Sequence, residues 1–203
     1  MKFERLKSAL SGIDIDSKTL KRLELFTKTL MEWNRVHNLT GAKSEGEIAE
    51  QIADSLWPIT FLPSSPKTLL DIGSGAGFPG LILAAAWPKT ETTLCEPLKK
   101  RASFLRYAAL ELDLPRVKVE AKRVEEIEPA KFDLITSRAV TRTERLMEWC
   151  RPFIAEGTNV LFYKGERADE EAKELGECNT KIIEREKRNY LWIKDAFRCL
   201  KYC

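Results

Sequence analysis

Apolar positions in the first sixty residues recur at helical spacing. An amphipathic helix is predicted for residues 17–36, because apolar side chains return there every three or four positions. Shorter helices are predicted for residues 2–10 and 44–57. The second of these begins at Ser44, and Glu47 in its first turn completes a capping box. The beginning of the chain is therefore predicted to be helical.

From residue 68 onward the pattern changes to short apolar runs that alternate with amphipathic segments. Two strands near the end have no helix between them, so they are predicted to form an antiparallel hairpin at the edge of a mostly parallel sheet. The fold class is therefore α/β. The predicted strands are 68–72, 91–95, 117–120, 132–136, 158–163, 180–187 and 197–202, with a weaker apolar segment at 190–194, and the predicted helices are 79–87, 98–112, 142–155 and 166–175.

The proline-rich stretch Leu62–Pro66 divides the chain into two parts of one structural unit. A helical extension, residues 1–63, precedes a core of residues 64–203. Hydrophobic residues make up 43% and charged residues 32% of the chain, which is typical of soluble globular proteins. The sequence contains neither a membrane-spanning run nor the apolar region of a signal peptide, so a cytoplasmic protein is expected. A monomer is also expected.

The chain carries five cysteines without a Cys-x-x-Cys pair, and His37 is its one histidine. The cysteines are predicted to be reduced thiols rather than a disulfide framework, and no metal site is expected. A single histidine also disfavours a Ser-His-Asp triad. The net charge of +3 does not by itself indicate a nucleic-acid binder, so that prediction depends on local clusters of basic residues.

The most informative segment runs from residue 68 to residue 80. An apolar strand that contains one acid, Asp71, is followed by Gly73, Gly75 and Gly77 and then by the start of a helix. A strand, a glycine turn and a helix together present backbone N–H groups and a helix N-terminus to a ligand. The three glycines are therefore candidate cofactor-binding residues.

One acid follows the second predicted strand. Glu96 lies 23 residues after Gly73, near the offset at which dinucleotide folds place an acid to accept hydrogen bonds from ribose hydroxyls. An NAD-like cofactor and S-adenosylmethionine could both use this carboxylate. The spacing Gly-x-Gly-x-Gly departs from the Gly-x-Gly-x-x-Gly that favours a pyrophosphate. The loop therefore favours S-adenosylmethionine.

Basic residues gather in the loops that follow the predicted strands. Positive side chains there could meet the phosphate backbone of a nucleic acid. The helical arginines, among them Arg142 and Arg145, can equally form a solvated face beside Glu144. Arg138, after the fourth predicted strand, is a candidate for holding a target base or phosphate. The candidate RNA-binding residues are Lys99, Lys100, Arg101, Arg123 and Lys164.

Several motifs occur in a specific order between about residues 30 and 165. They are Trp33-Asn34, Asn38-Leu39-Thr40, Asp54-Ser55, the segment Asp71–Gly80 with its Gly-Phe-Pro-Gly end, Lys100-Arg101, Arg123-Val124-Glu125, Ser137-Arg138-Ala139 and Lys164-Gly165. In these motifs the chain resembles the bacterial 16S rRNA guanine-N7 methyltransferase family, called RsmG or glucose-inhibited division protein B. The resemblance implies a Rossmann-like class I S-adenosylmethionine-dependent methyltransferase domain with N-terminal helices.

The resemblance also implies roles for individual residues. Gly73 and Phe78 would contact S-adenosylmethionine from the glycine loop. Val124 and Glu125 would flank its adenine, and Arg138 would lie at the cofactor and target-base site.

Two places depart from the pattern of that family. Glu50-Gln51 stand where many members have a basic residue and a histidine, and this puts in doubt a role of that helix in gripping RNA. Glu96 stands where many members have Asp. This second change is conservative for hydroxyl recognition but alters the reach of the carboxylate by one methylene.

The implied chemistry agrees with what the sequence lacks. Guanine N7 has an in-plane lone pair and needs no deprotonation, so positioning can suffice without a His base or a Cys nucleophile. The segment Thr136–Val140 also lacks the Asn/Asp-Pro-Pro-aromatic motif of exocyclic-amine methyltransferases. We therefore predict methyl transfer from S-adenosylmethionine to a guanine N7 in 16S rRNA, free or in a small-subunit precursor. A small-molecule methyltransferase, an NAD-dependent oxidoreductase and a non-catalytic RNA-binding module remain alternatives.

Overall fold

A seven-stranded sheet in the order β3-β2-β1-β4-β5-β7-β6 forms the centre of the molecule. The computed structural model describes residues 4–176, 178–186 and 188–201. The first five strands are parallel, whereas β7 runs antiparallel to both β5 and β6. The strands are β1 (Thr68–Ile72), β2 (Glu91–Cys95), β3 (Val117–Glu120), β4 (Leu134–Arg138), β5 (Asn159–Lys164), β6 (Thr180–Arg185) and β7 (Arg188–Ile193).

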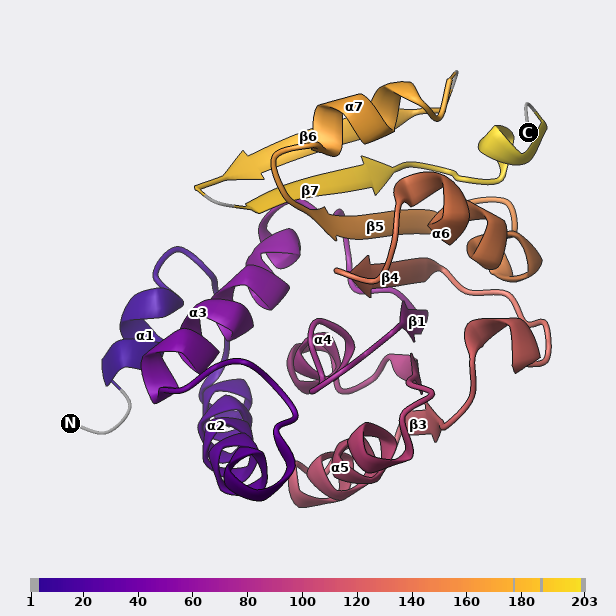
Figure 1. Cartoon of the computed structure of the whole chain (residues 1–203). Helices are drawn as coiled ribbons and strands as arrows, with labels where there is room; N and C mark the ends of the chain where they lie inside the picture. The colour runs from indigo at the N-terminus through magenta and orange to yellow at the C-terminus, as the bar shows by residue number, and fades with distance from the viewer. Residues whose placement is uncertain (1–3, 177, 187, 202–203) are drawn as a thin grey trace.

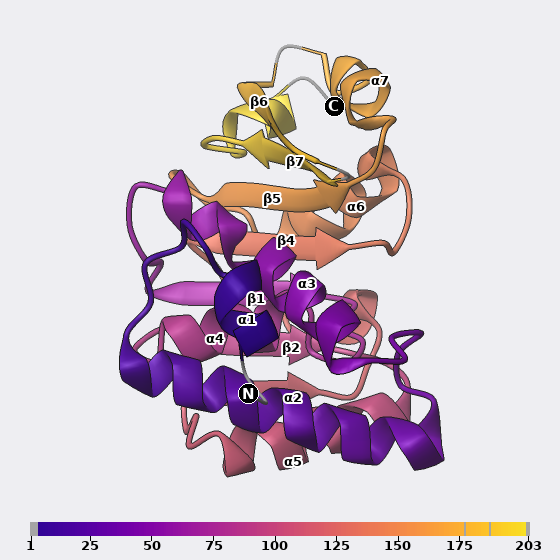
Figure 2. The same cartoon turned by 90° about the vertical axis from the view of Figure 1, so that its left-hand side faces the viewer.

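Helices pack on both faces of this sheet (Figure 1). The first three lie together across one face, in front of the strands in Figure 2. The helices are α1 (Glu4–Ala9), α2 (Ser17–His37), α3 (Glu45–Leu56), α4 (Gly80–Ala86), α5 (Lys99–Glu111), α6 (Thr143–Cys150) and α7 (Ala168–Lys173), with short 3-10 turns η1 (Trp57–Thr60), η2 (Val124–Glu126), η3 (Arg151–Phe153) and η4 (Arg198–Lys201).

The two faces of β1 contribute to two separate hydrophobic cores. Leu69 packs in the core that α1 to α5 share, whereas Leu70 and Ile72 pack in the core beneath α6 and α7. All three side chains are buried, as expected for a parallel strand covered by helices on both faces. This explains why the strand reads as a nearly continuous apolar run in which Asp71 is the one charged residue.

Helix α3 is attached to the sheet by two tyrosine hydroxyls. The Tyr163 hydroxyl donates to the Ser55 carbonyl (2.8 Å), and the Tyr190 hydroxyl donates to the Asp54 carbonyl (3.0 Å). Helices α1 to α3 also share one apolar cluster with α4 and α5. The division of the chain after residue 63 stays a prediction. In the part of the chain that is described, no helix has both the length and the apolar character to cross a bilayer.

Most predicted elements lie where the sequence placed them. Ser44 caps α3, and its hydroxyl accepts the Glu47 backbone N–H (3.2 Å), as the capping box predicted. The strand predicted at 132–136 is shifted, because β4 begins at Leu134, where its pairing with Leu69 of β1 starts. As a result Arg138 is the last residue of β4 rather than part of the following loop.

The prediction for the last strands was wrong in one place. The second strand of the hairpin is β7, at the segment that the sequence analysis treated as the weaker one, and residues 198–201 form η4 instead of a strand. Tyr190 and Leu191 are fully buried because β7 lies between β5 and β6 and is covered on both faces. An internal antiparallel strand of this kind lacks the apolar-polar alternation of an edge strand.

The prediction that the cysteines are reduced was also wrong for one pair. Cys178 precedes β6 and Cys199 follows β7, and the antiparallel hairpin brings them together in a disulfide with a Cα–Cα distance of 5.0 Å. Their separation of 21 residues gave no hint of this pairing. Cys95 and Cys150 are buried free thiols, and Cys203 lies outside the described residues.

Candidate active site

A cavity of about 490 Å³ opens at the carboxyl ends of β1, β2 and β4. In an open parallel sheet this edge, where the chain crosses from one side of the sheet to the other, is the usual place for a ligand. Six of the residues predicted from the sequence line this cavity, although they come from four separate segments. They are Gly73, Gly75, Phe78, Glu96, Arg101 and Arg138.

The glycine loop has the left-handed backbone that its composition suggested. Gly73 has φ 75° and Gly77 has φ 101°, values that L side chains rarely adopt. A Cβ at Gly73 would overlap the Val140 side chain, whereas one at Gly77 would press on Leu81 and Phe26 at 3.2–3.3 Å. Gly73 therefore allows close approach at the cavity, and Gly77 allows the loop to pack on α2 and α4.

Asp71 connects β1 with the start of α4 and with β4 through hydrogen bonds. Its carboxylate accepts the Gly80 N–H at the start of α4 (3.1 Å) and the Thr136 hydroxyl of β4 (2.9 Å). Burial raises the pKa of this fully buried carboxyl from 3.8 to about 6, although hydrogen bonds oppose the shift. The sequence analysis did not name Asp71 as a site residue. The available signal was a single acid in a strand that is otherwise apolar.

Glu96 connects the end of β2 to the glycine loop. Its Oε2 atom accepts the Gly75 N–H (2.9 Å), and its Oε1 atom accepts the Leu98 N–H (2.8 Å). The side chain is buried, with the residue 3% exposed, yet it borders the cavity. Because a carboxylate has about four acceptor positions, two remain for ribose hydroxyls.

Arg138 extends from β4 and faces the glycine loop. Its guanidinium carbon lies 4.8 Å from the centre of the Phe78 ring, and its Nη2 atom donates to Gln51 Oε1 (3.0 Å). Burial, together with repulsion from Arg188, lowers the pKa of Arg138 from its ordinary value. A guanidinium has five N–H donors, so the bond to Gln51 orients the group and leaves donors for a ligand.

Gln51 was missed as a site residue. The sequence analysis noted it only as a departure that weakened the case for RNA contacts by its helix. In the structure it comes from α3, 87 positions before Arg138 in the chain, and accepts a hydrogen bond from that guanidinium. One signal in the sequence could have identified it, because Gln51 stands at a position where many members of the family have a histidine.

The residues expected to flank an adenine follow β3 and are not among the residues that line this cavity. Val124 and Glu125 form η2 after β3, where Val124 is buried in the core beneath α6 and Glu125 is exposed. Neither lines the cavity, and the same is true of Arg123. Lys99 and Lys100 are exposed in the first turn of α5. The structure therefore brings Arg101 to the cavity, whereas these other candidates are not among its lining residues.

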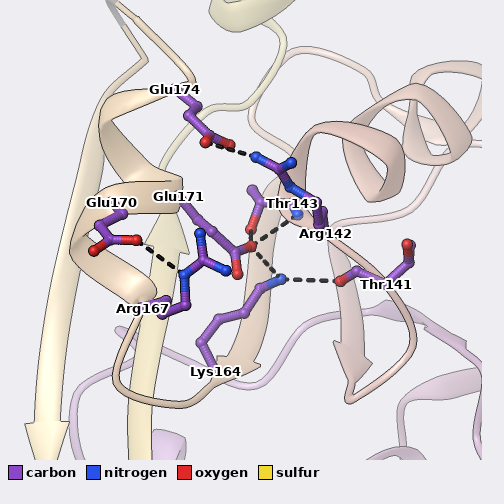
Figure 3. Close-up of polar contacts among 8 residues, drawn as sticks. All are labelled: Thr141, Arg142, Thr143, Lys164, Arg167, Glu170, Glu171 and Glu174. Atoms are coloured by element: carbon purple, nitrogen blue, oxygen red, sulfur yellow. Dashed lines mark hydrogen bonds and ion pairs between the residues drawn. The ribbon is translucent and has the colours of Figure 1, made fainter.

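Lys164 occupies a different environment from the other basic candidates (Figure 3). Its side chain is 9% exposed, and its ammonium contacts Glu171 Oε2 (2.8 Å) and the Thr141 carbonyl (3.2 Å). The sequence analysis expected this lysine to face RNA. In the structure its charge is directed into the protein instead.

A second and larger cleft, of about 1000 Å³, lies between α1, α3 and the turn that joins β6 to β7. Asp54, Arg185 and Arg188 line it, and the Arg188 Nε atom contacts Asp54 Oδ2 at 3.1 Å. Gln51 also lines this cleft, so the hydrogen bond between Gln51 and Arg138 joins it to the first cavity. The two spaces are therefore neighbours.

Comparisons with known proteins agree with this architecture. A family model described as rRNA small subunit methyltransferase G matches residues 19–194. Similar curated proteins named Ribosomal RNA small subunit methyltransferase G occur in Wolinella succinogenes, at 54% identity over 80% of this chain and 83% of the relative, and in Aliarcobacter butzleri, at 40% identity over 91% and 94%.

A solved structure shows the same fold at low sequence identity. A mutant of MtNAS in complex with S-adenosylmethionine aligns with 94% of this chain and 88% of its own, with a TM-score of 0.57 and 16% identity. Such a likeness concerns the fold alone. Together with the strand order, it confirms the α/β fold class with a mostly parallel sheet and an antiparallel edge hairpin.

Proposed function

Because this chain belongs to the rRNA small subunit methyltransferase G family, we propose that it transfers a methyl group from S-adenosylmethionine to N7 of a guanine in 16S rRNA. The family membership confirms the resemblance, the enzyme class and the cofactor expected from the sequence. The observation that carries the proposal is a family match over residues 19–194, which includes the glycine loop, Glu96 and Arg138. The three alternative functions find no such support.

The residues of the first cavity fit the cofactor. The glycine loop leaves space where side chains would stand, and Gly73 and Gly75 expose backbone to the cavity. We propose that Glu96 accepts ribose hydroxyls and that Phe78 and Arg138 border the reacting end. When bound, S-adenosylmethionine supplies an electrophilic methyl group attached to a sulfonium. The contribution of Val124 and Glu125 to an adenine site stays a prediction.

The protein would promote the reaction by orienting the base and the methyl group rather than by acid-base catalysis. Guanine N7 needs no general base, and His37 packs beside Trp33, with ring centres 5.3 Å apart, outside the residues that line the cavity. Burial raises the pKa of Cys95 to about 12 and raises that of Cys150 as well, so neither thiol is a thiolate nucleophile near neutral pH. Arg138 is proposed to hold the base in line with the methyl group.

We propose that the target nucleotide approaches from the second cleft and meets Arg138 at its junction with the cofactor cavity. The hydrogen bond between Arg138 and Gln51 supports this route, because it links the linings of the two spaces. Phosphates of the RNA would contact four basic side chains that are exposed or half-buried. These are Lys99, Lys100, Arg101 and Arg123.

Three finer expectations complete the proposal. The enzyme would act as a monomer, and it would act in the cytoplasm. Its substrate would be 16S rRNA, either free or within a precursor of the small subunit. The family name supports ribosomal RNA as the substrate class.

The proposal is tested with a tritiated-methyl transfer assay on small ribosomal subunits that lack the modification. We expect label in 16S rRNA and 7-methylguanosine when the nucleosides are identified by mass. Label in a different nucleoside would contradict the position of transfer. Calorimetry serves as the control and should show binding of S-adenosylmethionine but not of NADH. If the protein binds S-adenosylmethionine and no label enters the RNA, the proposed RNA substrate is contradicted.

A further inference from the structure

A largely buried charge pair lies where α7 packs beside the end of β5 (Figure 3). Lys164, the last residue of β5, contacts Glu171 of α7, and their side chains are 9% and 16% exposed. One carboxylate oxygen, Glu171 Oε2, also accepts the backbone N–H of Thr143 (2.9 Å) and its hydroxyl. A single atom of α7 therefore gathers three donors from two other elements.

The pair differs from two ion pairs at the ends of α7. Arg167 contacts Glu170 and Arg142 contacts Glu174, but all four of these side chains are at least 39% exposed. Exposed pairs of this kind contribute little to stability, whereas removal of one member of a buried pair leaves an uncompensated charge. Burial alone would raise the pKa of Glu171, yet the hydrogen bonds from Lys164 and Thr143 outweigh it and lower that pKa.

The two charges hold one short segment from both sides. Lys164 binds the carbonyl of Thr141, and Glu171 binds the N–H of Thr143 at the start of α6. Between β4 and this point, Ala139 has a left-handed backbone with φ 54°. The loop of residues 139–143 is thus fastened at its far end by side chains of β5 and α7.

The fastened loop forms one wall of the cofactor cavity. Ala139 and Val140 line it together with Arg138, and a Val140 methyl lies where a Cβ of Gly73 would stand. Val140 is nevertheless 41% exposed, so neighbouring side chains do not enclose it. Its place over the glycine loop therefore depends on how the loop is anchored.

We propose that Lys164 and Glu171 are positioning residues, which hold the loop 139–143 against the glycine loop and thereby strengthen the binding of S-adenosylmethionine. This assigns Lys164 a role inside the protein rather than a contact with an RNA phosphate. The inference rests on the cofactor part of the proposed function. It does not depend on the identity of the methyl acceptor.

The test measures S-adenosylmethionine binding by calorimetry without RNA. The decisive variant is Glu171→Gln, which keeps the shape of the side chain and an acceptor oxygen but removes the charge that attracts Lys164. We expect the Kd to rise about threefold to tenfold, a range that corresponds to the weakening of one buried charged hydrogen bond. The matched control is Glu170→Gln, which makes the same change on the same helix in an exposed pair that does not touch the loop, and it should leave the Kd within about twofold.

A second variant distinguishes a role of Lys164 in positioning the loop from a role in contacting an RNA phosphate. Lys164→Met should raise the Kd for S-adenosylmethionine by about tenfold, and the double variant with Glu171→Gln should be no worse than Lys164→Met, because both changes disrupt one unit. If Lys164 instead contacts a phosphate, Lys164→Met will weaken RNA binding and leave the cofactor Kd unchanged. That result would overturn the proposal.

Hydrogen exchange of the folded protein provides a readout independent of binding. Faster exchange within residues 139–143 of Glu171→Gln, absent from the Glu170→Gln control, would support the positioning role. An unchanged Kd with unchanged exchange would overturn it, and so would loss of the fold in Glu171→Gln, since the pair would then be a determinant of folding. The calorimetry and the hydrogen exchange use no RNA, so they can be interpreted even if the protein does not methylate rRNA. Conversely, an unchanged cofactor Kd in the variants would not exclude rRNA methylation.

Discussion

The cofactor cavity has two halves that are built in different ways. On the side of β1 and β2, Asp71 binds Gly80, and Glu96 binds Gly75 and Leu98, so these backbone partners lie within residues 75–98, and only the Thr136 hydroxyl comes to Asp71 from a remote strand. On the side of β4 and β5, Arg138 depends on Gln51 of α3, 87 positions away. The first half consists mainly of backbone groups held by buried carboxylates, whereas the second depends on one charged side chain, Arg138, which a distant helix orients.

This difference separates two tasks. Backbone N–H groups and glycines in a rigid turn suit a cofactor whose shape is constant. Side chains that depend on remote helices can be changed one at a time, and they suit orientation of a target base. Substitutions in the first half should therefore act mainly on the free energy of unfolding, and those of Arg138 and Gln51 in the second half on turnover.

Substitution Gly80→Ala should produce the largest effect in the first half. A Cβ at residue 80 would lie 2.5–2.6 Å from Asp71 and Leu94, and both neighbours are fully buried. We expect the free energy of unfolding to fall by at least about 3 kcal/mol, because the core cannot move aside. Urea denaturation measures it, with Gly165→Ala as the control, since nothing lies within 4 Å of that position. Equal stability of the two variants would contradict this account.

The buried carboxyl of Asp71 should give an unusual pH dependence. Its pKa is about 6 in the folded protein against 3.8 ordinarily, so between these values the folded state keeps a proton that the unfolded state releases. Its contribution to stability is therefore complete below about pH 4 and is lost as the pH rises to about 6, by up to about 3 kcal/mol. Urea unfolding from pH 4 to 7 should show this decline relative to Asp71→Asn. Parallel curves for the two proteins would refute it.

In the second half, Arg138→Ala should reduce kcat/KM for rRNA by about 100-fold, which is typical of losing one well-placed charged donor. The melting temperature should change by only a few degrees. Arg138→Lys should recover little, because an ammonium cannot replace the planar fork that contacts both Gln51 and the Phe78 ring. Lys28→Ala, an exposed change on α2, is the control. Undiminished turnover by Arg138→Ala would exclude its proposed role.

Loss of the remote partner should have a smaller effect. Gln51→Ala removes the acceptor that orients Arg138 but leaves the guanidinium in place, so we expect kcat/KM to fall by about tenfold. Gln51→Glu retains an acceptor oxygen at the same distance from the backbone and should stay close to the activity of the unmodified protein. Steady-state methylation assays compare them. If both variants lose activity equally, hydrogen bonding to Arg138 is not the reason that Gln51 matters.

Sequence patterns predicted the first half well and the second half only in part. The strand, glycine turn and helix of residues 68–86 follow from hydrophobic spacing and from backbone conformations that glycine favours, which are local properties. The positions of Gly73 and Glu96 at one cavity followed from the rule that parallel strands end at the same edge. The burial of Lys164 could not be predicted, because its partner Glu171 belongs to another element and the charge of a residue does not reveal which way it points.

By itself, the sequence determined the α/β class, the helices and parallel strands, the glycine turn and the family motifs, because all of these depend on neighbours in the chain. Only the tertiary structure decided that β7 is an internal strand, that Cys178 pairs with Cys199, that Gln51 holds Arg138 and that Lys164 is buried against Glu171. Each of these contacts joins separate elements. Their formation depends on how whole helices and strands pack, and no local pattern specifies that packing.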